Sequence, residues 1–151
     1  MRQEFTEALK AAMRAGDKRR VSTLRLVQSA LKDKDIELRG AGKAEAGPDE
    51  ILALLQKMVK QRQESLDIYE KNNREDLASQ EREEIAIIRE FMPQQMDEAE
   101  VKAAIAKAVA EAGATSMKDM GKVVGLLRQK YAGRMDFGKA SALVKAALSG
   151  S

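Results

Sequence analysis

The side chains that could do chemistry in this chain are carboxylates, amines, guanidiniums and hydroxyls, because its 151 residues include no His, no Cys and no Trp. Without His there is no imidazole general base and no Ser-His-Asp triad. Without Cys there is no thiolate nucleophile, no disulfide and no zinc-thiolate site. The Glu-x-x-His motif of di-iron bundles is excluded for the same reason. Any function must therefore rest on charge and shape, or on carboxylate, Lys, Tyr, Ser or Thr chemistry.

The acidic run at residues 80–84 (QEREE) is the densest group of possible metal ligands, with Glu81, Glu83 and Glu84. Carboxylates crowded on a helix are more typical of a solvent-facing side, so we predict that this side is exposed and binds no metal. The P-loop and dinucleotide fingerprints are absent from the sequence. We therefore predict no catalytic residues, no metal and no cofactor.

The basic side chains are unevenly distributed along the chain. The net charge is only +3, and residues 1–96 carry 18 basic and 18 acidic side chains. Residues 97–151 carry 9 basic and 6 acidic side chains, and the segment 116–151 carries 7 and 2. A second basic group comprises Lys18, Arg19, Arg20 and Arg25. Such surfaces permit a polyanionic partner, and a solvated helical face is the alternative interpretation.

The basic C-terminal segment supplies the candidate RNA-binding residues. They are Lys122, Arg128, Lys130, Arg134 and Lys139. Gly121, Gly125 and Gly133 would let a phosphate backbone come close to the chain. The alternatives are that Gly125 permits tight helix packing and that Gly133 ends a helix. The few aromatic residues are expected in the core, so recognition of RNA shape and backbone is favoured over base stacking.

The elements that must hold these residues are helices, as long stretches of 3.6-residue periodicity and only two prolines indicate. The first part is predicted to form helices at 3–15, 17–38, 48–71 and 74–92, with a glycine-rich loop at 40–47. Asp17 is the expected N-cap of the second helix, and Pro48 the first residue of the third.

Pro93 is the strongest boundary, because a proline excludes the preceding residue from the helical region. We predict an N-terminal helical domain at 1–92, a linker at 93–96 and a three-helix domain at 97–151. Asp97 with Glu100 resembles a capping box. A helix that starts at Ser116 should bury Met117 and Met120, and Asp136 should cap the last helix.

The chain is expected to be cytoplasmic, not membrane-bound, and monomeric by default. No stretch approaches the ~18 apolar residues of a membrane span. The N-terminus lacks the apolar core of ~7–15 residues that a signal peptide has.

Five segments together resemble the GatB/YqeY domain family, most closely its stand-alone YqeY-like members. Residues 120–141 read MGKVVGLLRQKYAGRMDFGKAS, residues 20–32 read RVSTLRLVQSALK and residues 57–65 read KMVKQRQES. Residues 74–81 read REDLASQE and residues 91–96 read FMPQQM. The segment 133–138 departs from the family pattern, with Met135 for a small residue and Phe137 inserted before Gly138.

The resemblance implies an all-α protein related to the tail of the B subunit of tRNA-dependent amidotransferase. In that enzyme the tail helps to hold tRNA, and the catalytic parts lie elsewhere. By this resemblance the chain is an RNA-associated accessory protein whose partner is tRNA or a protein that processes aminoacyl-tRNA.

Two other functions stay open at this point. One is a protein-interaction module without RNA binding, in which the long N-terminal helices form a groove or hairpin. The other is a part in carbon–nitrogen ligation with glutamine as the amide donor, which the family implies. No nucleophile–base pair or nucleotide motif is visible, so we do not expect the chain to catalyse that reaction alone.

Overall fold

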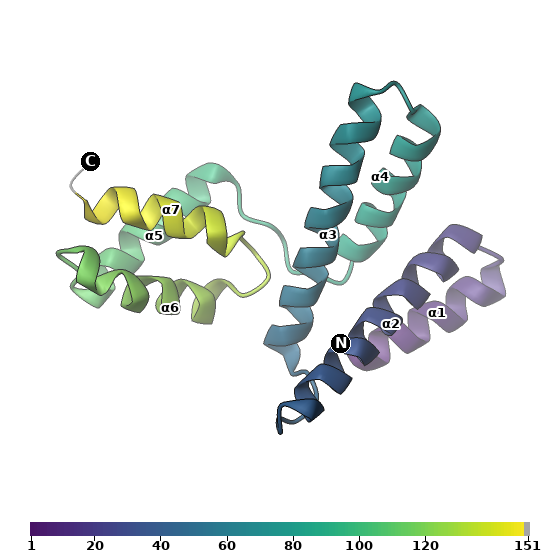
Figure 1. Cartoon of the computed structure of the whole chain (residues 1–151), viewed down its shortest axis with the longest axis horizontal. Coiled ribbons are helices and arrows are strands. Elements are labelled where there is room, and N and C mark those ends of the chain that lie inside the picture. Colours follow the sequence, from purple (N-terminus) through teal and green to yellow (C-terminus); the bar gives the residue numbers. More distant parts are fainter. Residues whose placement is uncertain (150–151) are drawn as a thin grey trace. The chain divides into compact units, whose positions relative to one another are not determined.

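A computed structural model describes residues 1–149, and within them the regular structure is entirely helical, which confirms the all-α prediction. The elements are α1 (Arg2–Ala15), α2 (Lys18–Gly40), α3 (Pro48–Lys71), α4 (Glu75–Arg89), α5 (Glu98–Ala112), a 3-10 turn η1 (Met117–Asp119), α6 (Met120–Tyr131) and α7 (Phe137–Leu148) (Figure 1). Residues 150–151 of the predicted C-terminal domain lie outside the described residues.

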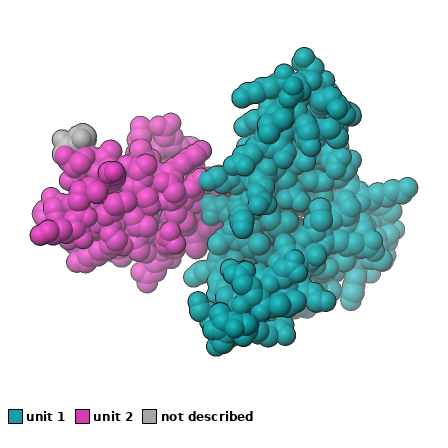
Figure 2. Space-filling view, in the orientation of Figure 1, with its two compact units in different colours: residues 1–93 teal, residues 94–151 magenta. Residues whose placement is uncertain are grey.

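The chain folds as two compact units, and the boundary lies between Pro93 and Gln94 (Figure 2). Unit 1 is Met1–Pro93 and unit 2 begins at Gln94. Residues 94–96, predicted as a linker, are hydrogen-bonded to the turn before α7: the Arg134 side chain donates to the carbonyl of Gln94, and the amide of Met96 donates to the carbonyl of Arg134, both at 2.9 Å. These residues therefore belong to the second unit.

The predicted helix caps are present. Asp17 accepts a hydrogen bond from the amide of Arg20 at the start of α2. Asp97 and Glu100 form a complete capping box at the start of α5. Asp136 accepts from the first amides of α7. Each cap satisfies amides that have no partner inside the helix, which explains why these starts could be predicted from local sequence.

Helix α4 is shorter than predicted. The periodicity indicated 74–92, whereas the helix spans Glu75–Arg89. The amides of Phe91 and Met92 bond to carbonyls three residues back, which is the tighter 3-10 pattern. Pro93 disfavours helical geometry at Met92, so the last turn tightens and ends before it.

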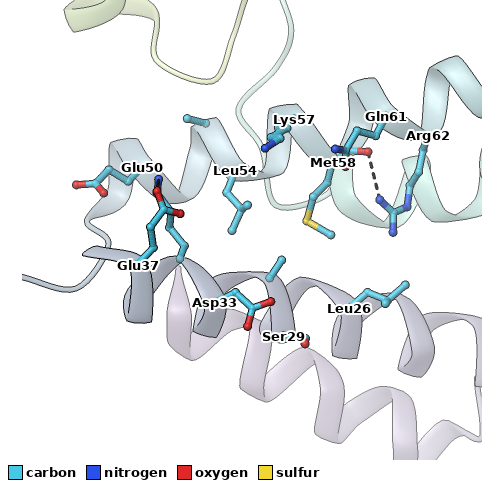
Figure 3. A pocket seen from close by; sticks show the side chains of 13 residues that line it. Leu26, Ser29, Asp33, Glu37, Glu50, Leu54, Lys57, Met58, Gln61 and Arg62 are labelled. Atoms are coloured by element: carbon cyan, nitrogen blue, oxygen red, sulfur yellow. Dashed lines mark hydrogen bonds and ion pairs between the residues drawn. The ribbon is translucent and has the colours of Figure 1, made fainter. Parts of the chain in front are cut away.

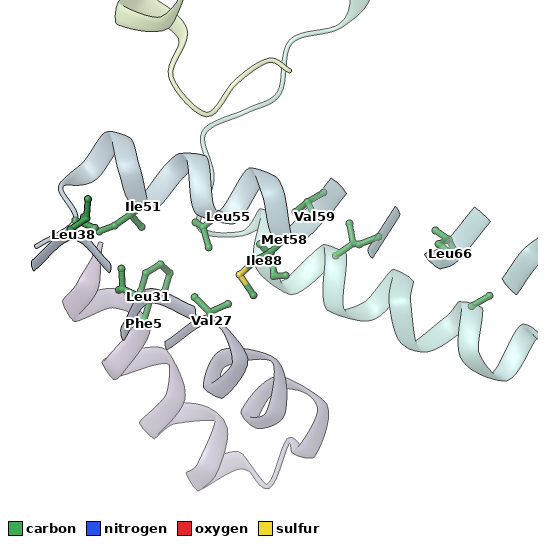
Figure 4. Packing of buried hydrophobic residues seen from close by; sticks show 13 residues of the cluster. Phe5, Val27, Leu31, Leu38, Ile51, Leu55, Met58, Val59, Leu66 and Ile88 are labelled. Carbon is green, nitrogen blue, oxygen red and sulfur yellow. The ribbon is translucent and has the colours of Figure 1, made fainter. Parts of the chain in front are cut away.

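Unit 1 is built from two helical hairpins, α1 with α2 and α3 with α4, and α4 also packs on α2 (Figure 1). Its core is drawn in Figure 4 and includes Phe5, Val27, Leu31, Leu38, Ile51, Leu55, Met58, Leu66 and Ile88. The ring of Phe5 meets that of Phe91 edge to face, with centroids 5.0 Å apart. These side chains recur at three- and four-residue spacing, which gives each helix one buried stripe.

A charged clasp fixes the loop between α2 and α3. The guanidinium of Arg2 donates two hydrogen bonds to Asp35, at 2.8 and 2.9 Å, and a third to the carbonyl of Ala46. The amide of Ala46 donates to Asp35 as well. The Arg2 hydrogen bonds, followed by the Ala46 amide, lower the pKa of Asp35 to about 2. The clasp sets the direction in which the chain enters α3.

The run 80–84 was predicted to face solvent, and this is wrong for its last residue. Glu84 is buried, and its carboxylate accepts a hydrogen bond from Arg62 of α3 at 3.1 Å. Gln80 donates to the other oxygen of Glu84. One oxygen of Glu81 is buried without a partner, and burial, with the charge of Glu84, raises the pKa of Glu81. The pairing partner lies on another helix, so local sequence could not reveal it.

Unit 2 packs α5, α6 and α7 around a small aliphatic core. The buried residues are Ala104, Ile105, Ala108, Val123, Leu127, Met135, Ala140 and Val144. Met117 was predicted to be buried, and this is wrong: its side chain is 41% exposed. The segment that starts at Ser116 forms the 3-10 turn η1 before α6 begins, so the helical periodicity does not extend back to Met117.

Candidate nucleic-acid interface

One side of α6 is open to solvent and carries two of the glycines and two of the cations. Val123 and Leu127 point into the core of unit 2, whereas Gly121, Gly125 and Arg128 are exposed. A Cβ atom built on either glycine would meet no heavy atom within 4 Å. Glycine inside a helix costs up to ~1 kcal/mol relative to alanine. Packing within the described structure does not require glycine at these two positions.

The guanidinium of this face is held by the first residue of α7. The guanidinium carbon of Arg128 lies 5.5 Å from the centre of the Phe137 ring, at the start of α7. Stacking on a ring holds a guanidinium in place while its edge donors stay available. Lys122 on α6 and Lys139 on α7 are exposed, and neither forms an ion pair with a described residue. We name Lys122 and Arg128, with Gly121 and Gly125, the α6–α7 face. Lys139 lines a different hollow, together with Gln95, Met96 and Arg134.

Lys130 is paired with an acidic residue of its own unit. Its ammonium forms an ion pair with Glu111 of α5, and this hydrogen bond lowers the pKa of Glu111. Both side chains are more than one third exposed, so the pair contributes little to stability. An anionic partner would have to displace Glu111 in order to pair with Lys130.

Arg134 and Gly133 also make internal contacts. Besides its bond to Gln94, the Arg134 guanidinium lies 5.9 Å from the centre of the Tyr131 ring. The carbonyl of Gly133 accepts a hydrogen bond from the Gln95 side chain at 2.6 Å. Gly133 is buried and has φ 75°, a conformation that favours glycine. The structure therefore separates these two from the α6–α7 face and assigns them to the turn that holds residues 94–96.

The two acidic side chains in the second half of unit 2 accept hydrogen bonds from backbone amides. Asp119 accepts from the amide of Thr115 at 3.0 Å, and Asp136 caps α7. Neither forms an ion pair with Lys122 or Arg128. The α6–α7 face keeps a positive potential that reaches solvent.

Residues 1–149 contain neither a cluster of possible metal ligands nor a helix able to span a membrane. No group of three or more Asp or Glu side chains lies close enough there to hold a metal ion. In the same residues no helix is both long and apolar enough to cross a bilayer.

A sequence profile of the family described as Yqey-like protein matches residues 2–148. The chain belongs to the YqeY-like family. This confirms the resemblance drawn from the five segments. It also places the family segments on the structure of this YqeY-like chain: 20–32 lies on α2, 57–65 on α3 and 120–141 on α6 and α7 with the turn between them.

Curated relatives of this YqeY-like chain carry the name altered inheritance of mitochondria protein 41, mitochondrial. The protein from Lachancea thermotolerans is 34% identical over 105 residues, which are 68% of this chain and 54% of the relative. That from Vanderwaltozyma polyspora is 33% identical, over 59% of this chain and 50% of the relative. That from Saccharomyces cerevisiae S288c is 34% identical, over 57% and 45%. The chain spans about half the length of these relatives.

Sequence reasoning missed the contacts that connect α3 to α4. Arg62 stands in the family segment 57–65, and its partner Glu84 follows the segment 74–81. The one signal in the sequence was that Arg62 lies next to buried residues on the helical stripe of α3, where a charged side chain needs a partner. Nothing in the sequence indicated which of the three neighbouring carboxylates it would meet.

Proposed function

We propose that this YqeY-like chain binds folded RNA of the tRNA class, through the α6–α7 face and by contact with the phosphate backbone. The observation that carries the proposal is the pair Gly121 and Gly125. They leave the backbone of α6 bare, beside cations that the fold does not pair. A bare helix surface lets a bulky strand approach, and a nearby guanidinium can then bind a phosphate with two hydrogen bonds.

The same face favours backbone contact over base reading. Tyr131 and Phe137 are partly buried in the core of unit 2, and Phe137 is covered on one side by Arg128. They are not free to stack on unpaired bases, which sequence-specific readers of single-stranded RNA need. Binding should depend on RNA fold and charge, and only weakly on sequence.

The proposal contains no chemical step. In the family resemblance the tail holds tRNA for an enzyme whose catalytic parts lie elsewhere, so carbon–nitrogen ligation would need a partner protein. A protein that processes aminoacyl-tRNA is the partner that fits this role. Glutamine-dependent amide transfer by the purified chain alone would contradict this assignment.

The compartment is part of the proposal, because tRNA is present in the cytoplasm and in mitochondria. We expected the cytoplasm, and the comparisons do not support it, because the relatives are named as mitochondrial proteins. Fractionation of cells that express the tagged chain, followed by immunoblotting, distinguishes the two.

A filter-binding titration with unfractionated tRNA tests the binding itself. Saturable binding is expected, with an affinity that falls between about 50 and 200 mM salt, by a slope of ~0.7–0.9 per phosphate contacted. Lys122→Glu with Arg128→Glu should abolish it. The matched control is Lys10→Glu with Arg14→Glu, two exposed cations of α1, which should bind like the wild type. No saturable binding at low salt, or equal losses in both variants, contradicts the proposal.

A further inference from the structure

A groove runs along α2 in unit 1, well apart in sequence from the α6–α7 face. Its first part is a hollow of about 650 Å³ between α2 and α3 (Figure 3). A second hollow, of about 930 Å³, continues past the start of α2 and reaches α4. Leu26 and Ser29 line both hollows, so the two form one groove. It faces α2 from Lys18 to Glu37, which corresponds to ~30 Å of helix.

The lining of the groove is suited to a helix. Leu26 is 47% exposed and Met13 is 53% exposed, and both line the groove. Leu54 and Met58 of α3 face Leu26 and Ser29 of α2 across the hollow (Figure 3). Ser29, Ala30 and Ala53 are small, so another backbone can come close at these positions. Apolar side chains of an incoming helix would find apolar partners on both walls.

Charge changes sign along the groove. Asp33, Glu37 and Glu50 lie at the end where α2 leads into α3, and Lys34 is the only described cation lining that end. Lys18 and Arg25 lie toward the other end, and Lys57 lies between. The remaining charged lining residues, Arg62 and Glu84, neutralise each other through their buried ion pair. The groove is therefore acidic at one end and basic at the other.

We propose that this groove binds an amphipathic helix of a partner protein, with the N-terminus of that helix at the acidic end. The positive end of the helix dipole and basic residues in its first turns would face Asp33, Glu37 and Glu50. Acidic residues in its last turns would face Lys18, Arg25 and Lys57. RNA does not fit this groove, because four carboxylates and two exposed apolar side chains line it. The inference goes beyond the proposed function, which uses unit 2 alone.

The probe is a display library of peptides of about 20 residues, long enough to span the groove as a helix, selected on the full chain. The enriched peptides should share apolar residues at i, i+3, i+4 and i+7. They should carry Lys or Arg in the first turns and Asp or Glu in the last. Their binding is then measured by fluorescence anisotropy, with the sequence-reversed peptide as the control for polarity. The reversed peptide should bind at least about tenfold more weakly.

Matched variants of α2 locate the binding. Leu26→Glu should weaken the selected peptides at least about tenfold. Ile36→Glu should leave them unchanged, because Ile36 is 55% exposed on the same helix and does not line the groove. Arg25→Glu should weaken them, and exchange of their last acidic residues for Lys should restore the affinity. A role of Arg25 in folding alone would not be rescued by the peptide.

Several different results would overturn the proposal. Failure to enrich any peptide, enrichment of peptides without a helical seam, or equal binding to wild type and Leu26→Glu would overturn the proposal. Preference for the opposite polarity would overturn it too. A wild-type dimer in sedimentation that Leu26→Glu dissociates would assign the groove to a second copy of this chain instead. None of these results depends on tRNA binding, which the α6–α7 face variants test separately.

Discussion

The two units of this chain use their arginines and lysines in different ways. In unit 1 several arginines form ion pairs that join one helix to another. The pairs are Arg2 with Asp35, Arg19 with Glu83, Arg20 with Glu90, Arg62 with Glu84, and Arg82 with Glu70. In unit 2 only Lys102 and Lys130 form ion pairs among the described residues. Lys122, Arg128 and Lys139 have none.

This difference indicates that an anionic partner should be sought on unit 2. In unit 1 the paired arginines are balanced locally and secure the helix packing. In unit 2 a core of small aliphatic side chains already holds three helices, and the cations of the α6–α7 face are left to solvent. A charge that the fold does not need is available to an anionic partner.

The strongest test of the comparison in unit 1 is the buried pair. Glu84→Ala should lower the free energy of unfolding by about 3 kcal/mol, because the largely buried guanidinium of Arg62 then loses its hydrogen-bonded carboxylate. Glu83→Ala, at the neighbouring position, should cost no more than about 1 kcal/mol, because its pair with Arg19 is exposed. Urea denaturation followed by circular dichroism measures both. Equal losses of unfolding free energy in the two variants would mean that burial does not determine how much these ion pairs contribute to stability.

The hydrogen-bonded ion pair at Asp35 should make the stability of unit 1 depend on pH. Its pKa in the folded chain is about 2, below the ~3.9 of an unfolded chain. The carboxylate therefore stabilises unit 1 fully above pH ~4, and this contribution is lost as the pH falls toward 2. Asp35→Asn should be less stable at pH 7 and should show a weaker loss of stability between pH 4 and 2. If the two chains show the same slope in denaturation at stepped pH, the clasp does not hold a charged Asp35.

A substitution at Gly125 of unit 2 should change stability and tRNA binding in opposite directions. Gly125→Ala should stabilise the fold by ~0.5–1 kcal/mol, because alanine is the better helix former and the new methyl group meets nothing. The same substitution should weaken tRNA binding if the RNA backbone comes close to α6. Thermal denaturation and the tRNA titration are to be run on one sample. A variant that is more stable and binds tRNA as well as the wild type would remove Gly125 from the interface.

The smallest effect is expected at Glu81. Burial raises the pKa of this carboxyl, so the charged form is disfavoured in the fold, and stability falls as the pH rises through the normal titration range of Glu. Glu81→Gln should therefore raise the Tm at pH 7 by ~1–2 °C and should have no advantage at pH 3. Scanning calorimetry at the two pH values detects the difference. A lower Tm for the variant at pH 7 would show that Glu81 is paired in its charged form.

Features that depend on neighbouring residues could be predicted from the sequence. The caps at Asp17, Asp97 and Asp136 and the start at Pro48 follow from which amides lack a partner at a helix end. The apolar stripes follow from helical periodicity. The family could be named because its segments occur in order along almost the whole chain.

Features that depend on contacts between helices could not be predicted. Glu83 and Glu84 are adjacent and chemically identical, and only the packing of α3 on α4 decides that Glu84 is buried. Lys130 and Arg128 looked equivalent as RNA-binding candidates, and the position of Glu111 on α5 separates them. The groove along α2 depends on the angle between two hairpins, which no local pattern encodes.

The most direct test of the account compares two variants that each lose three positive charges. One carries Gln at Lys122, Arg128 and Lys139 of unit 2, and the other carries Gln at Arg19, Arg20 and Arg82 of unit 1. Net charge is thus matched, and both are titrated with tRNA at one salt concentration. We predict that the first loses at least about tenfold in affinity and that the second stays within about twofold of the wild type. Equal losses in the two variants would contradict the account, because binding would then follow net charge and not the unpaired cations of unit 2.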